Sequence, residues 1–192
     1  MLEFEAKALA SLAAGRKCAL ELGTFCGDTA AVILPVLHLD GHLHTIDTFT
    51  AVSGGPYTKL VPRLEQIKQS LAVLESYEGR FTLMIGDYTK QAPCFADGLF
   101  DFIFIDGAHD YESVRRDITS WLPKLASGGV FCGHDFEDIP KDFDWDTIVA
   151  NSYEEHVNVE GEPGRHYGVI RAVTELFPKF NHKDRVWWVD PV

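Results

Sequence analysis

The sequence is poor in cysteine, in basic side chains and in long apolar runs. Its four cysteines form no Cys-x-x-Cys pair, which argues against a structural zinc site and against a disulfide framework. Lysine and arginine together number 17 against 29 aspartates and glutamates, and the formal net charge of −12 gives a polyanion little to bind. Apolar runs such as residues 30–37, which Pro35 interrupts, are too short to span a bilayer. We therefore expect neither nucleic acid nor a membrane as a partner.

The length and the first residues set the expected organisation. Residues 1–5 are acidic where a secretory signal would be basic, so we expect a cytoplasmic protein. A chain of 192 residues is long enough to bury one sizeable core, and we predict a single domain over residues 1–192. The sequence leaves the oligomeric state open, with a homo-oligomer among the alternatives.

Short apolar runs, typical of buried strands, alternate with segments whose apolar residues recur at helical spacing. The predicted strands cover residues 18–22, 43–47, 81–85, 100–105, 129–132 and 185–189. Buried strands that alternate with helices imply a parallel sheet covered on both faces. The predicted fold class is therefore α/β, with a doubly wound, mostly parallel, Rossmann-like sheet.

Two predicted helices have clear start signals. Pro62 precedes a segment in which Leu64, Ile67, Leu71 and Leu74 recur at helical spacing. Another helix should begin after Asp110, which is a suitable N-cap, and its apolar face should include Tyr111, Val114, Ile118 and Trp121.

An acidic connection follows the fifth predicted strand. Residues 136–166 contain nine acidic side chains and two basic ones. A connection this long is usually a cover over an active site or a solvated surface loop. We therefore treat residues 136–166 as an acidic lid or insertion.

The first strand ends in a glycine turn. Glu21 is followed by Gly23, Thr24 and Gly27, in the pattern Glu-x-Gly-x-x-x-Gly, and a helix begins directly afterwards. Glycine has no Cβ, so the backbone can approach a ligand closely. An acidic strand end beside such a turn suits the amino-acid end and ribose of a nucleoside cofactor such as S-adenosylmethionine. The closely spaced Gly-x-Gly-x-x-Gly that seats a pyrophosphate is missing, which disfavours a nicotinamide dinucleotide.

Carboxylates stand at the end of each of the first five predicted strands: Glu21, Asp47, Asp87, Asp106 and Asp135. Ligands of an open parallel sheet bind beyond these strand ends, and several buried carboxylates without partners would be costly. Asp47 is placed to bind a ribose diol, and Asp87 with Tyr88 to meet an adenine ring. We predict that all of these except Asp135 belong to a cofactor site, together with the glycine turn.

A second group combines Asp106 and Asp135 with His109 and His134. The fourth and fifth strands should be neighbours, so these side chains should face one another. Two carboxylates can hold Mg²⁺, whereas two histidines and a carboxylate suit a transition metal. Asp106, His134 and Asp135 are the candidate ligands, and Asp106, His109 and His134 the candidate catalytic residues. The alternative for each histidine is an ordinary hydrogen bond that supports the loops.

Three segments carry a family resemblance: residues 102–112 with Ile-Asp-Gly-Ala-His-Asp-Tyr-Glu, residues 128–136 with Gly-His-Asp-Phe, and residues 167–173. Through them the chain resembles the class I S-adenosylmethionine-dependent methyltransferases, over about residues 17–177. More narrowly, it resembles the small-molecule O-methyltransferase group that includes the macrocin, mycinamicin and cephalosporin-pathway enzymes.

This resemblance implies roles for the residues above. Glu21, Gly23, Gly27 and Asp47 would bind the methionine and ribose parts of the cofactor, and Asp87 with Tyr88 its adenine. The carboxylates of Asp106 and Asp135 would bind Mg²⁺. Two positions depart from the pattern, because Ala108 stands where some relatives have a carboxylate base and His134-Asp135 replaces a pair of aspartates. The tail is also shorter than two full antiparallel strands would need.

We therefore expect methyl transfer from S-adenosylmethionine to an oxygen of a small polar acceptor, with a divalent cation as an assisting cofactor. One alternative is a nucleoside-binding module of the same fold that has lost catalysis, for which Ala108 is the best hint. The others are an NAD-dependent oxidoreductase and an oxidative iron site at the histidines.

Overall fold

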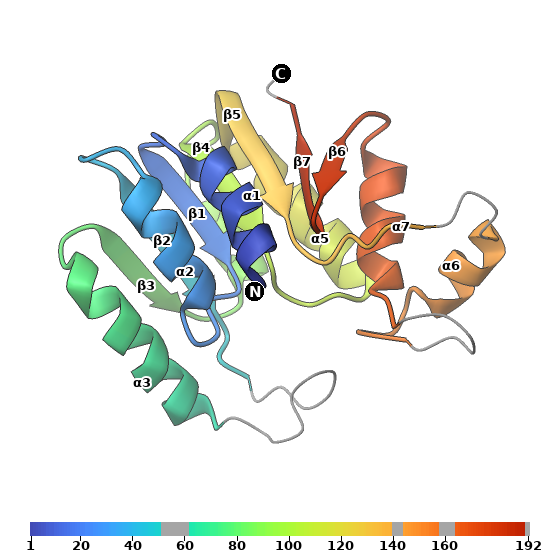
Figure 1. Ribbon diagram of the computed structural model, residues 1–192, viewed down its shortest axis with the longest axis horizontal. Helices are drawn as coiled ribbons and strands as arrows, with labels where there is room; N and C mark the ends of the chain where they lie inside the picture. Colours follow the sequence, from blue (N-terminus) through green and yellow to red (C-terminus); the bar gives the residue numbers. More distant parts are fainter. Residues whose placement is uncertain (51–61, 140–143, 158–163, 191–192) are drawn as a thin grey trace.

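The computed structural model describes residues 1–50, 62–139, 144–157 and 164–190. These residues form a seven-stranded sheet with helices on both faces, as Figure 1 shows. The strands are β1 (Cys18–Leu22), β2 (His42–Asp47), β3 (Phe81–Ile85), β4 (Phe100–Ile105), β5 (Leu125–Gly133), β6 (Asn181–Lys183) and β7 (Val186–Val189). The helices are α1 (Glu3–Ala13), α2 (Asp28–Ile33), α3 (Arg63–Leu74), α4 (Tyr88–Gln91), α5 (Tyr111–Trp121), α6 (Trp145–Asn151) and α7 (Tyr167–Leu176). Short 3-10 turns follow four of them: η1 (Leu34–Val36), η2 (Glu75–Tyr77), η3 (Ala92–Cys94) and η4 (Leu122–Lys124).

The strand order is β3-β2-β1-β4-β5-β7-β6. Strands β1 to β5 pair in parallel, whereas β7 runs antiparallel to both β5 and β6. The sheet starts at β1 in its interior, continues through β2 to β3, and the chain then crosses back to β4 on the other side of β1. The crevice at the carboxyl ends of β1 and β4 is therefore the topological switch point, where ligands of such sheets bind. The predicted doubly wound, mostly parallel sheet is confirmed.

The tail forms a short hairpin. Residues 186–189 pair with residues 181–183 across a tight turn at Asp184 and Arg185. Both turn residues adopt left-handed φ values, 53° and 64°, as a two-residue hairpin turn requires. The single strand predicted over residues 185–189 is thus β7, and the hairpin adds β6 as the edge strand.

Two hydrophobic clusters fill the space between the sheet and its two helix layers. One packs α5 and α7 against the sheet, and the other packs α1, α2 and α3 against the opposite face. Fully buried side chains such as Trp121 and Ile170 in the first cluster and Ile33 in the second each contribute roughly 1.5–3 kcal/mol. None of the helices in the described ranges is long and apolar enough to cross a membrane.

Helix α3 corrects one sequence-based expectation. The helix begins after Pro62, as predicted, but Leu64 and Leu71 are 63% and 45% exposed. Its buried face consists of Gln66, Ser70 and Leu74. The reason is that α3 packs closely on the glycine turn, where a Cβ at position 27 would lie 3.1 Å from the Cα of residue 70. The face of α3 that carries Ser70 is therefore turned to the glycine turn, and Leu64 and Leu71 lie on the outer face.

Candidate active site

The turn after β1 and the loop after β4 pack directly on each other. Gly23 has a φ of 96°, and a Cβ added there would overlap the backbone carbonyl of Asp106. Backbone hydrogen bonds hold the same region, with the Gly23 N–H donating to Ile46 at 2.9 Å and the Asp106 N–H to Leu22 at 2.8 Å. The structure therefore gives Gly23 a second reason to be glycine, namely contact with the neighbouring loop.

Glu21 lies fully buried beneath this turn. The Thr45 hydroxyl donates to Glu21 Oε2 and lies 2.5 Å from the Thr24 hydroxyl, so three polar side chains form one chain. Burial raises the pKa of Glu21 to about 8. Its second oxygen, Oε1, is buried without a hydrogen-bond partner among the described residues.

Asp47 organises the backbone around the turn. One carboxylate oxygen accepts from the Phe25 N–H at 2.7 Å and the other from the Phe49 N–H at 2.6 Å. Both phenylalanines have left-handed φ values, 44° and 49°, which these hydrogen bonds help to maintain. The carboxylate thus lies at the glycine turn, as predicted, and its contact with a ribose stays a prediction.

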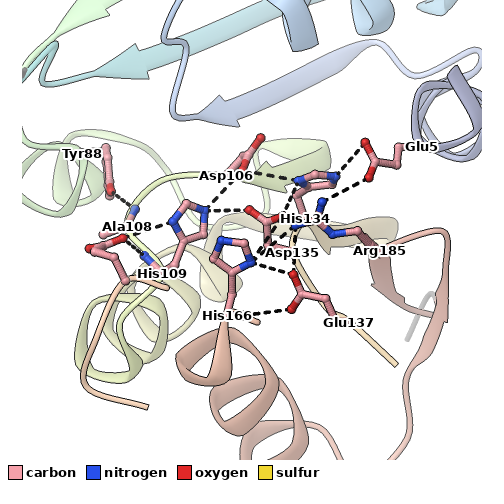
Figure 2. A network of polar contacts seen from close by, with 11 residues as sticks. Glu5, Tyr88, Asp106, Ala108, His109, His134, Asp135, Glu137, His166 and Arg185 are labelled. Carbon is pink, nitrogen blue, oxygen red and sulfur yellow. Dashed lines mark hydrogen bonds and ion pairs between the residues drawn. The ribbon is translucent and has the colours of Figure 1, made fainter. Parts of the chain in front are cut away.

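Asp87 and Tyr88 follow each other in the chain but make different contacts. Asp87 caps α4 by accepting from the Thr89 N–H at 3.0 Å, and bonding to the Thr89 hydroxyl lowers its pKa to about 2. The Tyr88 hydroxyl accepts from the Ala108 N–H at 3.4 Å, and a Cβ at Gly107 would collide with that hydroxyl. Figure 2 shows Tyr88 beside Ala108. Tyr88 therefore supports the loop after β4, and the adenine contact of both residues stays a prediction.

His109 leaves that loop and lies among carboxylates. Its Nε2 atom lies 2.9 Å from Asp135 Oδ2 and 3.7 Å from Asp106 Oδ1. Its backbone N–H and its Nδ1 atom both contact Glu155, at 2.8 and 3.1 Å. Figure 2 shows the imidazole beside Asp106 and Asp135.

His134 approaches the same carboxylates from the end of β5. Its Nδ1 atom lies 3.1 Å from Asp135 Oδ1 and 3.9 Å from Asp106 Oδ1, and its Nε2 atom 3.5 Å from Glu5 Oε2. Ligand atoms of Asp106, His134 and Asp135 all lie within 4.8 Å of one another, so this predicted trio is brought together and its donors fit a divalent cation.

Asp135 is the centre of the group. It is 7% exposed and has a left-handed φ of 59°. The Arg185 guanidinium donates to its Oδ1 atom and also to Glu137, at 2.9 Å. His166 approaches from the start of α7, with its Nδ1 atom 2.7 Å from Glu137 Oε1 and 3.6 Å from Asp135 Oδ1 (Figure 2).

These charges shift one another's pKa values. Burial lowers the pKa of His109, but the carboxylates of Asp106, Asp135 and Glu155 outweigh it and raise the pKa well above 6.5. Burial likewise opposes a positive charge on His134, yet mainly Asp135 raises its pKa to about 9. Burial would raise the pKa of Asp135, but the two imidazoles hold it below its usual range.

Five residues of this group were not predicted as site residues from the sequence: Glu5, Glu137, Glu155, His166 and Arg185. Glu137, Glu155 and His166 lie in the acidic segment 136–166, whose composition was the only available signal. Arg185 reaches the site from the hairpin turn. Glu5 looks like an ordinary surface acid of an amphipathic helix, but it is 1% exposed.

The described part of the acidic segment reaches back to the site. It contains α6, with Asp144 as its N-cap, and a backbone bridge between Val157 and Arg165. Gly168 lets the start of α7 lie against the loop after β4, because a Cβ there would overlap the His109 carbonyl. The described residues of the segment therefore supply contacts to the site, and a role of the segment as a lid stays a prediction.

Comparison with known proteins gives the family. A family model described as a methyltransferase domain matches residues 20–136, more than half of the chain. This range includes the glycine turn, the strand-end carboxylates and both loops that carry His109 and His134. The chain therefore belongs to this methyltransferase family, and its sheet is the Rossmann-like sheet of class I methyltransferases.

Solved structures with the same fold include several O-methyltransferases. The enzyme TomG from Streptomyces achromogenes, involved in tomaymycin synthesis and solved with S-adenosylmethionine, is 15% identical; 98% of this chain aligns with 80% of TomG at a TM-score of 0.64. An O-methyltransferase from Bacillus cereus in complex with S-adenosylhomocysteine is 18% identical. The match covers 99% of this chain and 82% of that chain, at a TM-score of 0.65. A putative O-methyltransferase from Klebsiella pneumoniae is also 18% identical. The match covers 99% of this chain and 81% of that chain, at a TM-score of 0.64.

Proposed function

We propose that this protein transfers the methyl group of S-adenosylmethionine to an oxygen of a small polar acceptor. We further propose that Asp106, His134 and Asp135 hold an assisting divalent cation such as Mg²⁺. One observation carries the proposal: the glycine turn at Gly23 packs on the backbone of Asp106. A cofactor at the turn and an acceptor at the carboxylates would therefore be neighbours.

Two halves of the site follow from this. The cofactor half is the group at the glycine turn, composed of Glu21, Gly23, Thr24, Gly27, Thr45 and Asp47. The proposed cofactor contacts also include Asp87, Tyr88 and Asp106. The buried, unpartnered Oε1 atom of Glu21 fits a donor such as the amino group of the cofactor. Structural neighbours solved with S-adenosylmethionine or S-adenosylhomocysteine support this choice of ligand.

The acceptor half is the group of Asp106, His109, His134, Asp135 and His166. S-adenosylmethionine supplies an electrophilic methyl group on a sulfonium, so the protein mainly has to align the reactants and remove a proton. A divalent cation would supply positive charge that favours a deprotonated acceptor oxygen. Asp106 lies where the two halves meet and would orient the acceptor. Ala108 carries no base, so we assign proton removal to His109, or to His134 where no ion is bound to it. The neighbouring carboxylates raise the pKa of both imidazoles, so either would act as a base only at alkaline pH or after a bound cation has offset that negative charge.

The test is methyl transfer by the purified protein, followed as S-adenosylhomocysteine release with a panel of small hydroxyl-bearing acceptors. We expect Asp106→Asn to lower the rate on the order of 100-fold or more, because it removes a cation ligand and an acceptor contact. Asp40→Asn is the matched control, since that carboxylate is 91% exposed and has no contact with the site residues named above.

Equal rates for Asp106→Asn and the native protein would show that Asp106 is structural. Release that is unchanged by a chelator would remove the cation from the proposal while leaving methyl transfer in place. A complete absence of turnover with saturable cofactor binding would instead favour the non-catalytic nucleoside-binding module.

A further inference from the structure

We propose that His109, Asp135 and His166 form a second cation site, which selects a transition-metal ion rather than Mg²⁺. It lies beside the trio of Asp106, His134 and Asp135 and shares Asp135 with it. The proposal does not depend on methyl transfer, because ion binding can be measured without cofactor or acceptor.

The geometry brings the three ligands together. One ligand atom of each residue lies within 4.8 Å of the other two, and the ring centroids of His109 and His166 are 4.7 Å apart. Zinc binds imidazole and carboxylate at about 2.0–2.2 Å, which places its ligand atoms roughly 3–3.6 Å from one another. The Nε2 atom of His109 is already 2.9 Å from Asp135 Oδ2, and His166 Nδ1 is 3.6 Å from Asp135 Oδ1, so a bound ion would have to draw His166 closer to complete the site.

The surroundings of His109 Nε2 are those of a metal ligand. This atom is buried, and its neighbours are the carboxylates of Asp135 at 2.9 Å and Asp106 at 3.7 Å. The other ring nitrogen, Nδ1, is held by Glu155 at 3.1 Å. His166 is oriented in the same way, with its Nδ1 atom 2.7 Å from Glu137. An imidazole fixed by a carboxylate on one nitrogen is the usual arrangement of a metal-binding histidine.

Charge also favours a cation. The residues in direct contact around Asp135 and the histidines include five carboxylates and one guanidinium, that of Arg185. The carboxylates belong to Glu5, Asp106, Asp135, Glu137 and Glu155. Arg185 occupies the Oδ1 side of Asp135, which leaves Oδ2 facing His109. A divalent ion that displaces the proton of His109 would put two positive charges in place of one beside these carboxylates.

The donor set determines the class of ion. Mg²⁺ takes oxygen ligands and keeps several waters, whereas two imidazoles and one carboxylate suit zinc and other transition metals. Such an ion would also tie the start of α7 to the loops after β4 and β5, since His166 directly precedes Tyr167. The acidic segment would then be anchored at its carboxyl end by the metal.

The experiment is equilibrium dialysis of the purified full chain with Zn²⁺ in the presence of millimolar Mg²⁺, with bound metal measured by mass spectrometry. We expect Zn²⁺ bound at this site in the native protein, which Mg²⁺ does not displace. His166→Ala should weaken Zn²⁺ binding at least about tenfold. The control is His38→Ala, which removes a partly exposed imidazole outside the site.

His166→Gln is a second variant, because glutamine keeps a polar group beside Glu137 but is a poor metal ligand. Circular dichroism checks that each variant is folded. Asp106→Asn should leave Zn²⁺ bound at this site, although it impairs the proposed Mg²⁺ trio. Unchanged Zn²⁺ affinity in folded His166→Ala and His166→Gln, or displacement of Zn²⁺ by Mg²⁺, would overturn the proposal. Neither of these results bears on methyl transfer.

Discussion

The cofactor half and the acceptor half are held together in different ways. In the cofactor half, Asp47 accepts two backbone N–H groups and Thr45 donates to Glu21, so the partners of these carboxylates are neutral groups. In the acceptor half, carboxylates face imidazoles and a guanidinium across loops that come from distant parts of the chain. The cofactor half is held by hydrogen bonds from backbone and hydroxyl groups, whereas the acceptor half is a cluster of charged side chains whose carboxylates favour a bound cation.

The difference also separates local from long-range structure. The cofactor half comes from the ends of β1 and β2, which follow each other along the chain and pair side by side. The acceptor half needs α1, the loops after β4 and β5, the start of α7 and the turn between β6 and β7. Its geometry therefore depends on how α7 and the tail dock, and small changes in docking should affect it first.

The largest expected effect concerns the one buried acid of the cofactor half whose charge is unmatched. Burial raises the pKa of Glu21 from 4.5 to about 8, so its contribution to stability is complete below pH 4.5 and is lost as pH rises through about 8. The loss should approach about 1.4 kcal/mol per pH unit between those values. Glu21→Gln cannot ionise and should lack this decline.

Denaturant unfolding from pH 5 to 9 measures this comparison directly. The difference in unfolding free energy between Glu21→Gln and the native protein should grow with pH, whereas Glu78→Gln, an exposed position, should track the native protein. A difference that does not change with pH would mean that Glu21 is ionised in the folded protein.

The second prediction concerns the contact between Gly23 and the backbone of Asp106, where the two halves meet. Gly23→Ala places a Cβ on the Asp106 carbonyl and forces alanine to a φ of 96°, so we expect a loss of about 3 kcal/mol or more. Gly98→Ala is the control, because its φ is 69° and nothing lies within 4 Å of the added Cβ. It should cost about 1–2 kcal/mol. Similar losses in thermal unfolding for both variants would contradict the close contact.

The third prediction perturbs the acceptor half alone. Gly168→Ala would normally favour a helix, but its Cβ overlaps the His109 carbonyl and the Tyr111 N–H, so we expect a loss of about 1–3 kcal/mol. Thr174→Ala, at an exposed position of α7, should stay within about 0.5 kcal/mol.

Binding and turnover then distinguish the halves in the same variant. Gly168→Ala should retain its affinity for S-adenosylmethionine in calorimetry while methyl transfer falls. Equal losses of both would show that the two halves are not separable as described.

The smallest expected effect separates capping from ligand binding at Asp87. Asp87→Ala removes the N-cap of α4 and should cost about 1 kcal/mol, because the side chain accepts from the Thr89 N–H. Asp87→Asn can still cap and should be nearly as stable as the native protein. If asparagine also leaves cofactor affinity unchanged, the carboxylate charge has no part in cofactor binding.

The sequence predicted best those features that are local to the chain. Continuous apolar runs located β1 and β4 at their observed bounds, and Asp110 was identified as the N-cap of α5, where it accepts from the Ser113 N–H at 3.0 Å. Strand β5 begins at Leu125, earlier than the predicted residue 129, because its pairing with β4 shifts register between Phe100 and Phe102. A register irregularity leaves no periodic signal.

The rest of the site depends on contacts between distant segments. Arg185 lies in a left-handed turn with neither glycine nor asparagine, so nothing in its surroundings marks it as a partner of Asp135. Glu5 is buried only because α1 packs near the end of β5, where it meets His134. His166 becomes a site residue through the docking of α7, which Gly168 permits. Such residues are recognisable from the fold and not from their own motifs.

The most direct test of the account is a calorimetric titration of the purified full chain with S-adenosylmethionine. The account predicts saturable binding of one cofactor per chain, weakened but not abolished in Asp106→Asn, because Asp106 is one of several proposed cofactor contacts. The absence of saturable binding at millimolar cofactor would contradict it.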